Sequence, residues 1–144
     1  MDKITVFCDG GARGNPGPAA VGVVYKNKNG ATIKKFGETI GETTNNVAEY
    51  TAVILALKKA KQIFGKEKVK RIEFDFKLDS ELVVRQLNHQ YKIQEENLQA
   101  LFFVIWNLML DFGELSFSHI PREQNKEADV LVNQALDKKE ETLF

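Results

Sequence analysis

Apolar and polar residues alternate through the first forty residues in the way that is typical of β-strands. Three segments, residues 3–9, 20–26 and 32–40, are rich in β-forming residues. A glycine-rich stretch separates the first two, and the turn sequence NKNG from Asn27 separates the second and third. Because short connections join antiparallel neighbours, the pattern predicts an antiparallel meander of three strands.

After this meander the apolar spacing becomes helical. The helix pattern ends before Gly65 and its apolar positions are Val47, Tyr50, Val53, Ile54, Leu57, Ala60 and Ile63 or Phe64. RIEFDFKL, residues 71–78, alternates again and predicts a strand with one face in the core. Because a helix precedes this strand, it can lie parallel to the first strand.

The last part of the chain predicts two helices, a strand and a final helix. A short helix is expected at 80–87, a long apolar helix at 95–112 and a strand at 115–120. Pro121 interrupts that strand, and Asn125 is a candidate cap for the last helix. The apolar side of the last helix is formed by Ala128, Leu131, Val132, Ala135 and Leu136.

Length and element order agree with one domain. A chain of 144 residues can bury a full core, and the order predicts an α/β domain over residues 1–144 with a mixed five-stranded sheet. The charged run DKKEET, within residues 137–144, is expected to be a frayed end. Lys plus Arg and Asp plus Glu both number 20, so any basic surface for a polyanion must be local.

The cysteine and the N-terminus favour a cytoplasmic location. Cys8 is the single cysteine, which excludes an intrachain disulfide and a multi-cysteine metal site. The N-terminal MDKITVFCDG has a strand pattern rather than that of a secretory signal. The longest apolar run begins at Leu98, is interrupted by Asn107 and is too short to span a bilayer. We therefore expect a soluble cytoplasmic protein.

Four carboxylates occupy positions where a metal site can form. Asp9 ends the first predicted strand and Asp79 the fourth, so parallel pairing would bring both to the sheet edge where ligands bind. Glu49 lies in the first turn of the first long helix, and Asp129 near the start of the last. Carboxylates held together repel unless a cation neutralises them, and such hard oxygen ligands suit magnesium or manganese.

Each of these carboxylates also has a simpler structural interpretation. Asp79 precedes a predicted helix and is a candidate N-cap. Glu49 lies three residues after Asn46, as in a capping box. The negative charge of Asp129 can stabilise the start of a helix through the helix dipole, and Asp9 can be a turn residue. Taken singly, none of them establishes a metal site.

Four ordered motifs resemble those of the ribonuclease H type 1 family. They begin at Asp9, Thr43, Leu78 and His119 and read DGGARGNPGPAAVG, TTNNVAEYTAV, LDSELVV and HIPREQNKEADVLVNQALD. The resemblance covers residues 4–137. It implies a ribonuclease H-like fold, in which the first three strands are antiparallel and the fourth and fifth run parallel to the first.

The resemblance also implies a reaction and a cofactor. The reaction is endonucleolytic hydrolysis of the RNA strand of an RNA-DNA hybrid, giving 5′-phosphate and 3′-hydroxyl ends. Two Mg²⁺ ions about 4 Å apart, or Mn²⁺ in their place, would activate the water and stabilise the leaving oxygen. No membrane and no obligate protein partner is implied. The implied catalytic metal ligands are Asp9, Glu49, Asp79 and Asp129.

Further residues are implied to contact the hybrid. Glycines let a nucleic-acid backbone approach closely, and amide side chains match the RNA 2′-hydroxyl. His119 and Arg122 are rival candidates for an auxiliary role near Asp129. Each of these groups also has a simpler interpretation. The glycine-rich stretch can be a hairpin connection without a ligand, and Asn45 and Asn46 can be turn and cap residues. His119 and Arg122 can be solvated groups at the sheet edge. The implied substrate contacts are Gly10, Gly11, Arg13, Asn15, Thr44, Asn45, Asn46, Ser80 and Glu81.

Two other functions compete with a hybrid-cutting ribonuclease. A catalytically silent hybrid-binding module would be favoured by an altered carboxylate, but all four carboxylates are present. A nuclease of the same fold could instead act on DNA or on double-stranded RNA. The pair Asn45 and Asn46 and the GNPGP loop resemble the hybrid-cutting branch and argue against a DNA substrate.

Overall fold

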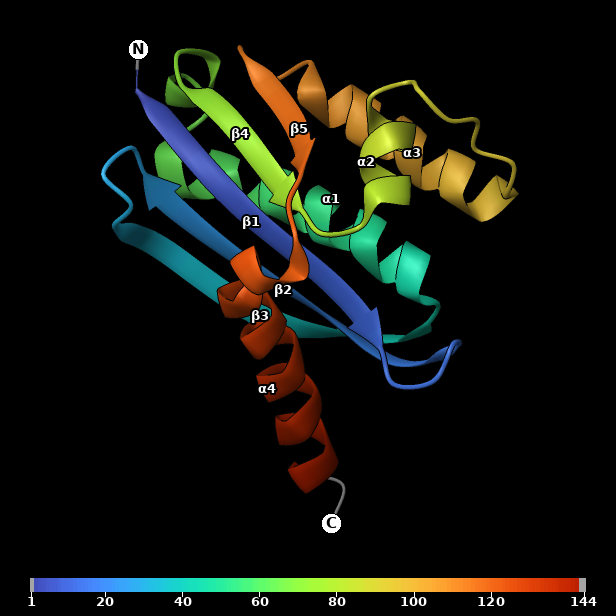
Figure 1. The fold of residues 1–144 in the computed structure, drawn as a ribbon. Coiled ribbons are helices and arrows are strands. Elements are labelled where there is room, and N and C mark those ends of the chain that lie inside the picture. Colours follow the sequence, from blue (N-terminus) through green and yellow to red (C-terminus); the bar gives the residue numbers. More distant parts are fainter. Residues whose placement is uncertain (1, 143–144) are drawn as a thin grey trace.

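A computed structural model of the protein describes residues 2–142 and is built on one mixed five-stranded sheet (Figure 1). The strand order is β3-β2-β1-β4-β5. Antiparallel pairs join β1 to β2 and β2 to β3, and parallel pairs join β1 to β4 and β4 to β5, which confirms the predicted topology. The strands are β1 (Lys3–Ala12), β2 (Gly17–Asn27), β3 (Thr32–Thr43), β4 (Glu73–Leu78) and β5 (Leu115–His119).

The helices cover the two faces of the sheet unequally. On one face α1 packs against β1 and β2, and α3 packs against α1. On the other face α4 crosses the antiparallel strands alone (Figure 1). Two short 3₁₀ turns, η1 (Lys68–Lys70) and η2 (Arg122–Gln124), lie in connections. The α-helices are α1 (Asn45–Phe64), α2 (Glu81–Leu87), α3 (Glu96–Met109) and α4 (Lys126–Thr142).

The main core lies between the sheet and α1. The alternation in RIEFDFKL is realised in β4, where Phe74, Phe76 and Leu78 are fully buried. A second, much smaller core lies under α4, where Val132 and Leu136 are buried with Ala20 of β2. The hydrophobic effect therefore holds α1 far more strongly than it holds α4.

Two glycines allow α4 to approach the sheet closely. Gly22 of β2 pairs with Asp9 on one side and with Gly37 of β3 on the other. A Cβ atom at Gly22 would lie 2.2 Å from the Ala128 carbonyl oxygen, and one at Gly37 would lie 2.6 Å from the Leu131 carbonyl oxygen. Any side chain at either position would push the helix outward, so these glycines bring the start of α4 next to Asp9.

The end of β1 differs from the sequence prediction. β1 does not stop at Asp9 but continues to Ala12, paired with β2. Its pairing with β4 ends at Cys8, which lies opposite Leu78. Asp9 thus marks the point where β1 loses one neighbour and its edge becomes free for other partners.

The C-terminal end of the described chain is also more ordered than expected. The prediction of a frayed end is wrong for residues 137–142, because α4 continues to Thr142. Lys and Glu favour helix, and Arg13 forms ion pairs with Asp137 at 2.7 Å and with Glu140 at 2.8 Å. Residues 143–144 lie outside the described part. Within residues 2–142, no helix is long and apolar enough to cross a lipid bilayer.

Candidate active site

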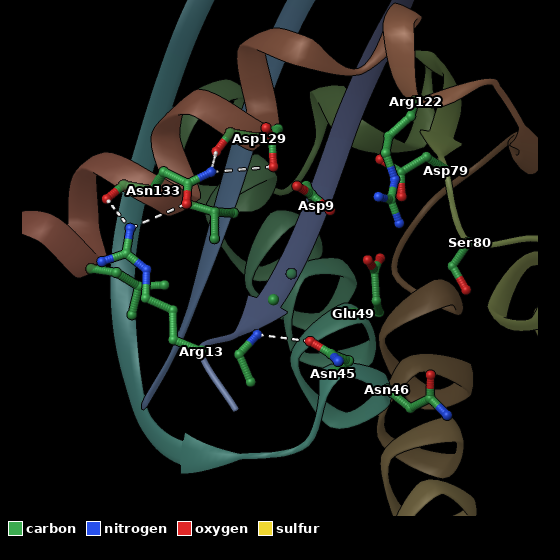
Figure 2. A pocket seen from close by; sticks show the side chains of 15 residues that line it. Asp9, Arg13, Asn45, Asn46, Glu49, Asp79, Ser80, Arg122, Asp129 and Asn133 are labelled. Carbon is green, nitrogen blue, oxygen red and sulfur yellow. Dashed lines mark hydrogen bonds between the residues drawn. The ribbon is translucent and has the colours of Figure 1, made fainter. Parts of the chain in front are cut away.

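The free edge of β1 carries a cluster of acidic side chains. Asp9 and Asp79 follow the paired residues Cys8 and Leu78 of two parallel neighbouring strands, so they emerge side by side. Glu49 reaches the same place from α1 (Figure 2). Each of these three side chains offers one carboxylate oxygen, and the three oxygens lie within 4.8 Å of one another. The predicted gathering of these carboxylates at one sheet edge is thus seen in the structure.

Gly10 explains how Glu49 reaches the strand edge. A Cβ atom at position 10 would lie 2.2 Å from the Ala48 carbonyl oxygen and 2.6 Å from the Glu49 backbone nitrogen. The backbones of α1 and β1 can therefore touch only because residue 10 has no side chain. This close approach of the protein's own helix accounts for the glycine, whereas the sequence interpretation attributed it to a nucleic-acid backbone.

The capping interpretations of Glu49 and Asp79 are wrong. α1 begins at Asn45, two residues earlier than its apolar pattern, and Thr44 caps it by accepting a hydrogen bond from the Val47 amide at 3.3 Å. Glu49 therefore lies in the second turn, beyond the reach of a capping box. Ser80 rather than Asp79 caps α2. Neither carboxylate is used to begin a helix, and both remain free to bind a ligand.

Asp129 lines the same pocket but differs from the other three carboxylates. It comes from the first turn of α4, and its side chain is exposed. Asn133, one turn further along α4, donates a hydrogen bond from Nδ2 to Asp129 Oδ1 at 3.4 Å. All four predicted carboxylates thus face one pocket, three in a tight cluster and the fourth at its side (Figure 2).

Burial and mutual repulsion perturb the clustered carboxylates. Burial, followed by the charge of Asp79, raises the pKa of Asp9 from 3.8 to about 7. Burial, followed by the charges of Asp9 and Asp79, raises the pKa of Glu49 well above its ordinary value. Both shifts follow from burial and from the negative charges gathered here, which disfavour the ionised carboxylates unless a cation neutralises them.

The donor set fits a divalent cation. Glu49 Oε2 is buried and has no hydrogen-bond partner among the described residues. A buried oxygen of this kind is costly unless a ligand satisfies it. A hard cation coordinated by Asp9, Glu49 and Asp79 would satisfy this atom and neutralise the repulsion, and carboxylate oxygens are the ligands that Mg²⁺ and Mn²⁺ prefer.

Asn125 holds the site together, a role that the sequence did not reveal. Its Nδ2 donates to the Cys8 carbonyl oxygen at 2.9 Å and to Asp79 Oδ2 at 3.1 Å. With 1% of its surface exposed, this side chain joins β1 to the carboxylate that follows β4. The prediction that Asn125 caps the last helix is therefore wrong: its side chain is turned to the site. In sequence, an asparagine before a helix looks the same in both roles.

The pocket above the cluster has a volume of about 470 Å³ and contains some of the predicted substrate residues. Arg122 reaches into it beside Asp79 (Figure 2), whereas His119 ends β5 on the exposed surface and does not line it. Asn15, Thr44 and Glu81 do not line it either. The predicted substrate and auxiliary residues that do are Gly10, Gly11, Arg13, Asn45, Asn46, Ser80 and Arg122.

Two predicted amide residues join the β1–β2 loop to α1. Asn15 Oδ1 accepts a hydrogen bond from the Asn45 backbone amide, and Asn45 Oδ1 accepts one from the Ala12 amide, both at 2.9 Å. Both oxygens are therefore used within the protein. Asn45 lines the pocket, and its NH₂ group is a hydrogen-bond donor. Glu81, by contrast, pairs with Arg85 of its own helix at 2.9 Å.

Comparisons with known proteins agree with this geometry. The chain matches the family described as reverse transcriptase-like over residues 7–135. It is 38% identical to ribonuclease HI of Halobacterium salinarum over 135 residues, which are 94% of this chain and 65% of that relative. The chain thus spans slightly less than two thirds of that curated relative, and 36% of a bifunctional protein of Mycobacterium tuberculosis with 35% identity.

Solved structures extend the similarity to three dimensions. LC11-RNase H1, isolated from compost by a metagenomic approach, superposes with a TM-score of 0.91 at 48% identity, covering 96% of this chain and 99% of that one. The same protein in complex with an RNA/DNA hybrid gives a TM-score of 0.90 at 47% identity over 94% and 98%. RNase H1 of Halobacterium salinarum gives 0.86 at 38% identity over 94% and 98%.

Fold and site together define an α/β protein with a cluster of carboxylates, able to hold a divalent cation, at the edge of a mixed sheet. With the matches above, this chain belongs to the ribonuclease H type 1 family.

Proposed function

We propose that this protein is an endoribonuclease that hydrolyses the RNA strand of RNA-DNA hybrids. The cluster of Asp9, Glu49 and Asp79, with its unsatisfied buried oxygen, is the observation that carries the proposal. The similarity to LC11-RNase H1, whose structure is known with an RNA/DNA hybrid, supports the choice of substrate. We further propose that residues 1–144 act as a single domain in the cytoplasm, without an obligate protein partner.

The four carboxylates are proposed to hold two Mg²⁺ ions when the hybrid is bound, with Mn²⁺ as a substitute. The ions would supply an activated water and charge stabilisation at the leaving 3′-oxygen, giving 5′-phosphate and 3′-hydroxyl ends. The protein's own contribution is geometric. Asp9, Glu49 and Asp79 fix the deep part of the site, and Asp129 completes it from α4.

The pocket wall is proposed to bind the sugar-phosphate backbone of the hybrid. Gly10 and Gly11 line the pocket on the free edge of β1, beyond its pairing with β4, where backbone groups can contact the hybrid. The NH₂ group of Asn45 and the side chains of Asn46 and Ser80 offer hydrogen bonds that fit a 2′-hydroxyl. Asn15, Thr44 and Glu81, which do not line the pocket, would act by shaping this wall or by contacts at its rim.

Arg122 is the better candidate of the two auxiliary residues. Its guanidinium extends into the pocket beside Asp79 (Figure 2), where a scissile phosphate next to the metal cluster would be within reach. His119 lies outside the pocket, at the exposed end of β5. We therefore propose Arg122 as the residue that assists at the phosphate.

The experiment that tests the function compares end-labelled substrates under single-turnover conditions. An RNA-DNA hybrid, double-stranded RNA, single-stranded RNA and duplex DNA are each incubated with Mg²⁺, with Mn²⁺ or with a chelator. We expect metal-dependent cutting of the RNA strand of the hybrid, and end mapping should give 5′-phosphates. Hybrid binding without cutting would instead indicate a silent binding module, and preferential cutting of double-stranded RNA or DNA a different substrate.

A further inference from the structure

The guanidinium of Arg13 is turned toward α4. Arg13 follows β1, and its Nη2 donates to Asn133 Oδ1 at 3.2 Å (Figure 2). The same Nη2 lies 2.7 Å from Asp137 Oδ1. Its Nη1 donates to Glu140 Oε1 at 2.8 Å. Three residues on successive turns of α4 thus bind the guanidinium of one arginine, which lies at the end of β1.

Asn133 connects this arginine to the fourth carboxylate. The Nδ2 of Asn133 donates to the Asp129 backbone oxygen at 3.1 Å and to Asp129 Oδ1 at 3.4 Å. A continuous chain of hydrogen bonds therefore runs from the β1–β2 connection through one amide side chain to a carboxylate of the site (Figure 2).

The orientation of the Asn133 amide follows from the chemistry of the guanidinium and the amide group. A guanidinium has hydrogen-bond donors and no acceptor, so it can face only the oxygen end of an amide. With Asn133 Oδ1 held by Arg13, the NH₂ end is turned to Asp129. If the amide turned over, its oxygen would face the carboxylate and repel it. Arg13 thus selects the one amide orientation that can hold Asp129.

We propose that Arg13 and Asn133 are positioning residues for the reaction, which orient Asp129 from outside the metal cluster. This inference rests on the proposed ribonuclease function. It assigns Arg13 a role different from the substrate contact expected from sequence, because its guanidinium is occupied by three side chains of α4.

Asp129 needs such support more than the other carboxylates do. Asp9 and Glu49 are each 7% exposed and are held by the packing around them, and Asp79 is held by the buried Asn125. Asp129 is exposed on a helix surface, where packing does not restrict its rotamers. A hydrogen bond to a second residue is the ordinary way to orient an exposed metal-binding side chain.

The first test measures single-turnover cleavage of the labelled hybrid by Asn133→Ala and Arg13→Ala. Loss of a residue that orients a metal ligand costs about 10- to 100-fold in activity or metal affinity. We expect kcat to fall about 10-fold and the Mg²⁺ concentration for half-maximal rate to rise by a similar factor, while KM for the hybrid changes less than about twofold. Gln134→Ala, at an exposed neighbouring position of α4, is the matched control and should behave as wild type.

The double variant shows whether Arg13 acts on Asp129 through Asn133 or whether the two residues affect activity independently. If Arg13 acts through Asn133, Arg13→Ala combined with Asn133→Ala should lose no more activity than the worse single variant. Arg13→Lys keeps the charge but loses the planar fork, so it should restore only part of the activity. If the activity losses of the two single variants instead multiply in the double variant, Arg13 does not act through Asn133 and the proposal is overturned.

A readout without nucleic acid keeps the test independent of substrate contacts. Calorimetric titration of Mn²⁺ into the free protein should show weaker binding by Asn133→Ala than by Gln134→Ala and wild type. A raised KM with unchanged kcat and unchanged Mn²⁺ binding would instead make Arg13 a phosphate contact and overturn the proposal. Absence of hybrid cleavage by wild type would refute the proposed function itself, a result distinguishable from wild-type cleavage that the substitutions leave unchanged.

Discussion

The site has a buried half and an exposed half, and the protein holds them by different means. Asp9 and Glu49 belong to the buried half, where the backbone contact at Gly10 and the main core fix their positions. Asp129 belongs to the exposed half, on a helix with a small core of its own, and polar side chains orient it.

This difference sets the electrostatic cost of each half. In the buried half, burial and neighbouring charges raise the pKa values of Asp9 and Glu49, so ionised carboxylates destabilise the fold unless a cation neutralises them. In the exposed half, water screens the charge, and the requirement is orientation rather than neutralisation. The buried half is therefore expected to depend on metal for stability, and the exposed half on hydrogen bonds for activity.

The largest expected difference between the halves is in catalysis. Asp9→Asn, Glu49→Gln and Asp79→Asn should each lower the single-turnover rate by about 10³-fold or more, because each removes about 4 kcal/mol of transition-state stabilisation by the metal cluster. Asp129→Asn should lose roughly 10- to 100-fold, because water can replace an exposed ligand. Circular dichroism checks that each variant is folded. An equal loss of single-turnover rate in Asp129→Asn would show that the exposed half contributes as much to catalysis as the buried half.

A strong effect on stability is expected at the contact between α1 and β1. Gly10→Ala places a Cβ atom 2.2 Å from the Ala48 carbonyl oxygen, and relieving this overlap should cost roughly 1 to 3 kcal/mol. Gly11→Ala is the matched control, since its Cβ would meet Val132 Cγ1 at an ordinary 3.7 Å. Thermal unfolding of both variants measures the difference. Equal melting temperatures would mean that α1 can move away at no cost.

The pH dependence of stability should identify the buried half. The pKa of Asp9 is about 7 in the folded protein against an ordinary 3.8, so the folded state keeps this proton longer than the unfolded chain. Without divalent cations the free energy of unfolding should therefore fall as the pH rises from about 4 to 7. Asp9→Asn removes this loss and should stabilise the metal-free protein above pH 7 by roughly 4 kcal/mol.

Chemical denaturation at several pH values in chelator checks this expectation, with the exposed Glu42→Gln as control. Added Mg²⁺ should stabilise wild type and have much less effect on Asp9→Asn, since ligands stabilise the state that binds them. A wild-type curve without a decline between pH 4 and 7 would contradict the raised pKa of Asp9.

The smallest effect on stability is expected at the ion pairs of the exposed half. Asp137→Asn combined with Glu140→Gln removes both charges that face Arg13, and exposed ion pairs contribute about 0 to 1 kcal/mol each. Thermal unfolding in low and high salt measures this change, which salt should reduce further. A loss comparable to that of Gly10→Ala would show that α4 depends on these pairs much more than exposed charges ordinarily allow.

Sequence reasoning found the parts of the site that depend on regular structure. The alternation of RIEFDFKL predicted the inner face of β4, and the parallel pairing of β1 and β4 predicted that Asp9 and Asp79 lie together. These inferences succeed because strand periodicity and sheet topology restrict where side chains point.

The residues that were missed depend on contacts between distant segments. Asn125 resembles a helix cap in sequence but binds Cys8 and Asp79 from across the site. The charged end of α4 resembled a frayed tail because its partner, Arg13, lies more than 120 residues away in sequence. Local patterns carry no information about such partners, whether they are buried, as Asn125 is, or exposed, as the end of α4 is.

The separate small core under α4 has a consequence for hydrogen exchange. Val132 and Leu136, with Ala20 of β2, make up the buried cluster on that face, whereas α1 belongs to the main core. Segments with little buried apolar surface open locally before the rest of a protein unfolds. Backbone amides of α4 should thus exchange with deuterium earlier than those of α1, and each such opening would detach Asp129 while the other three carboxylates stay assembled.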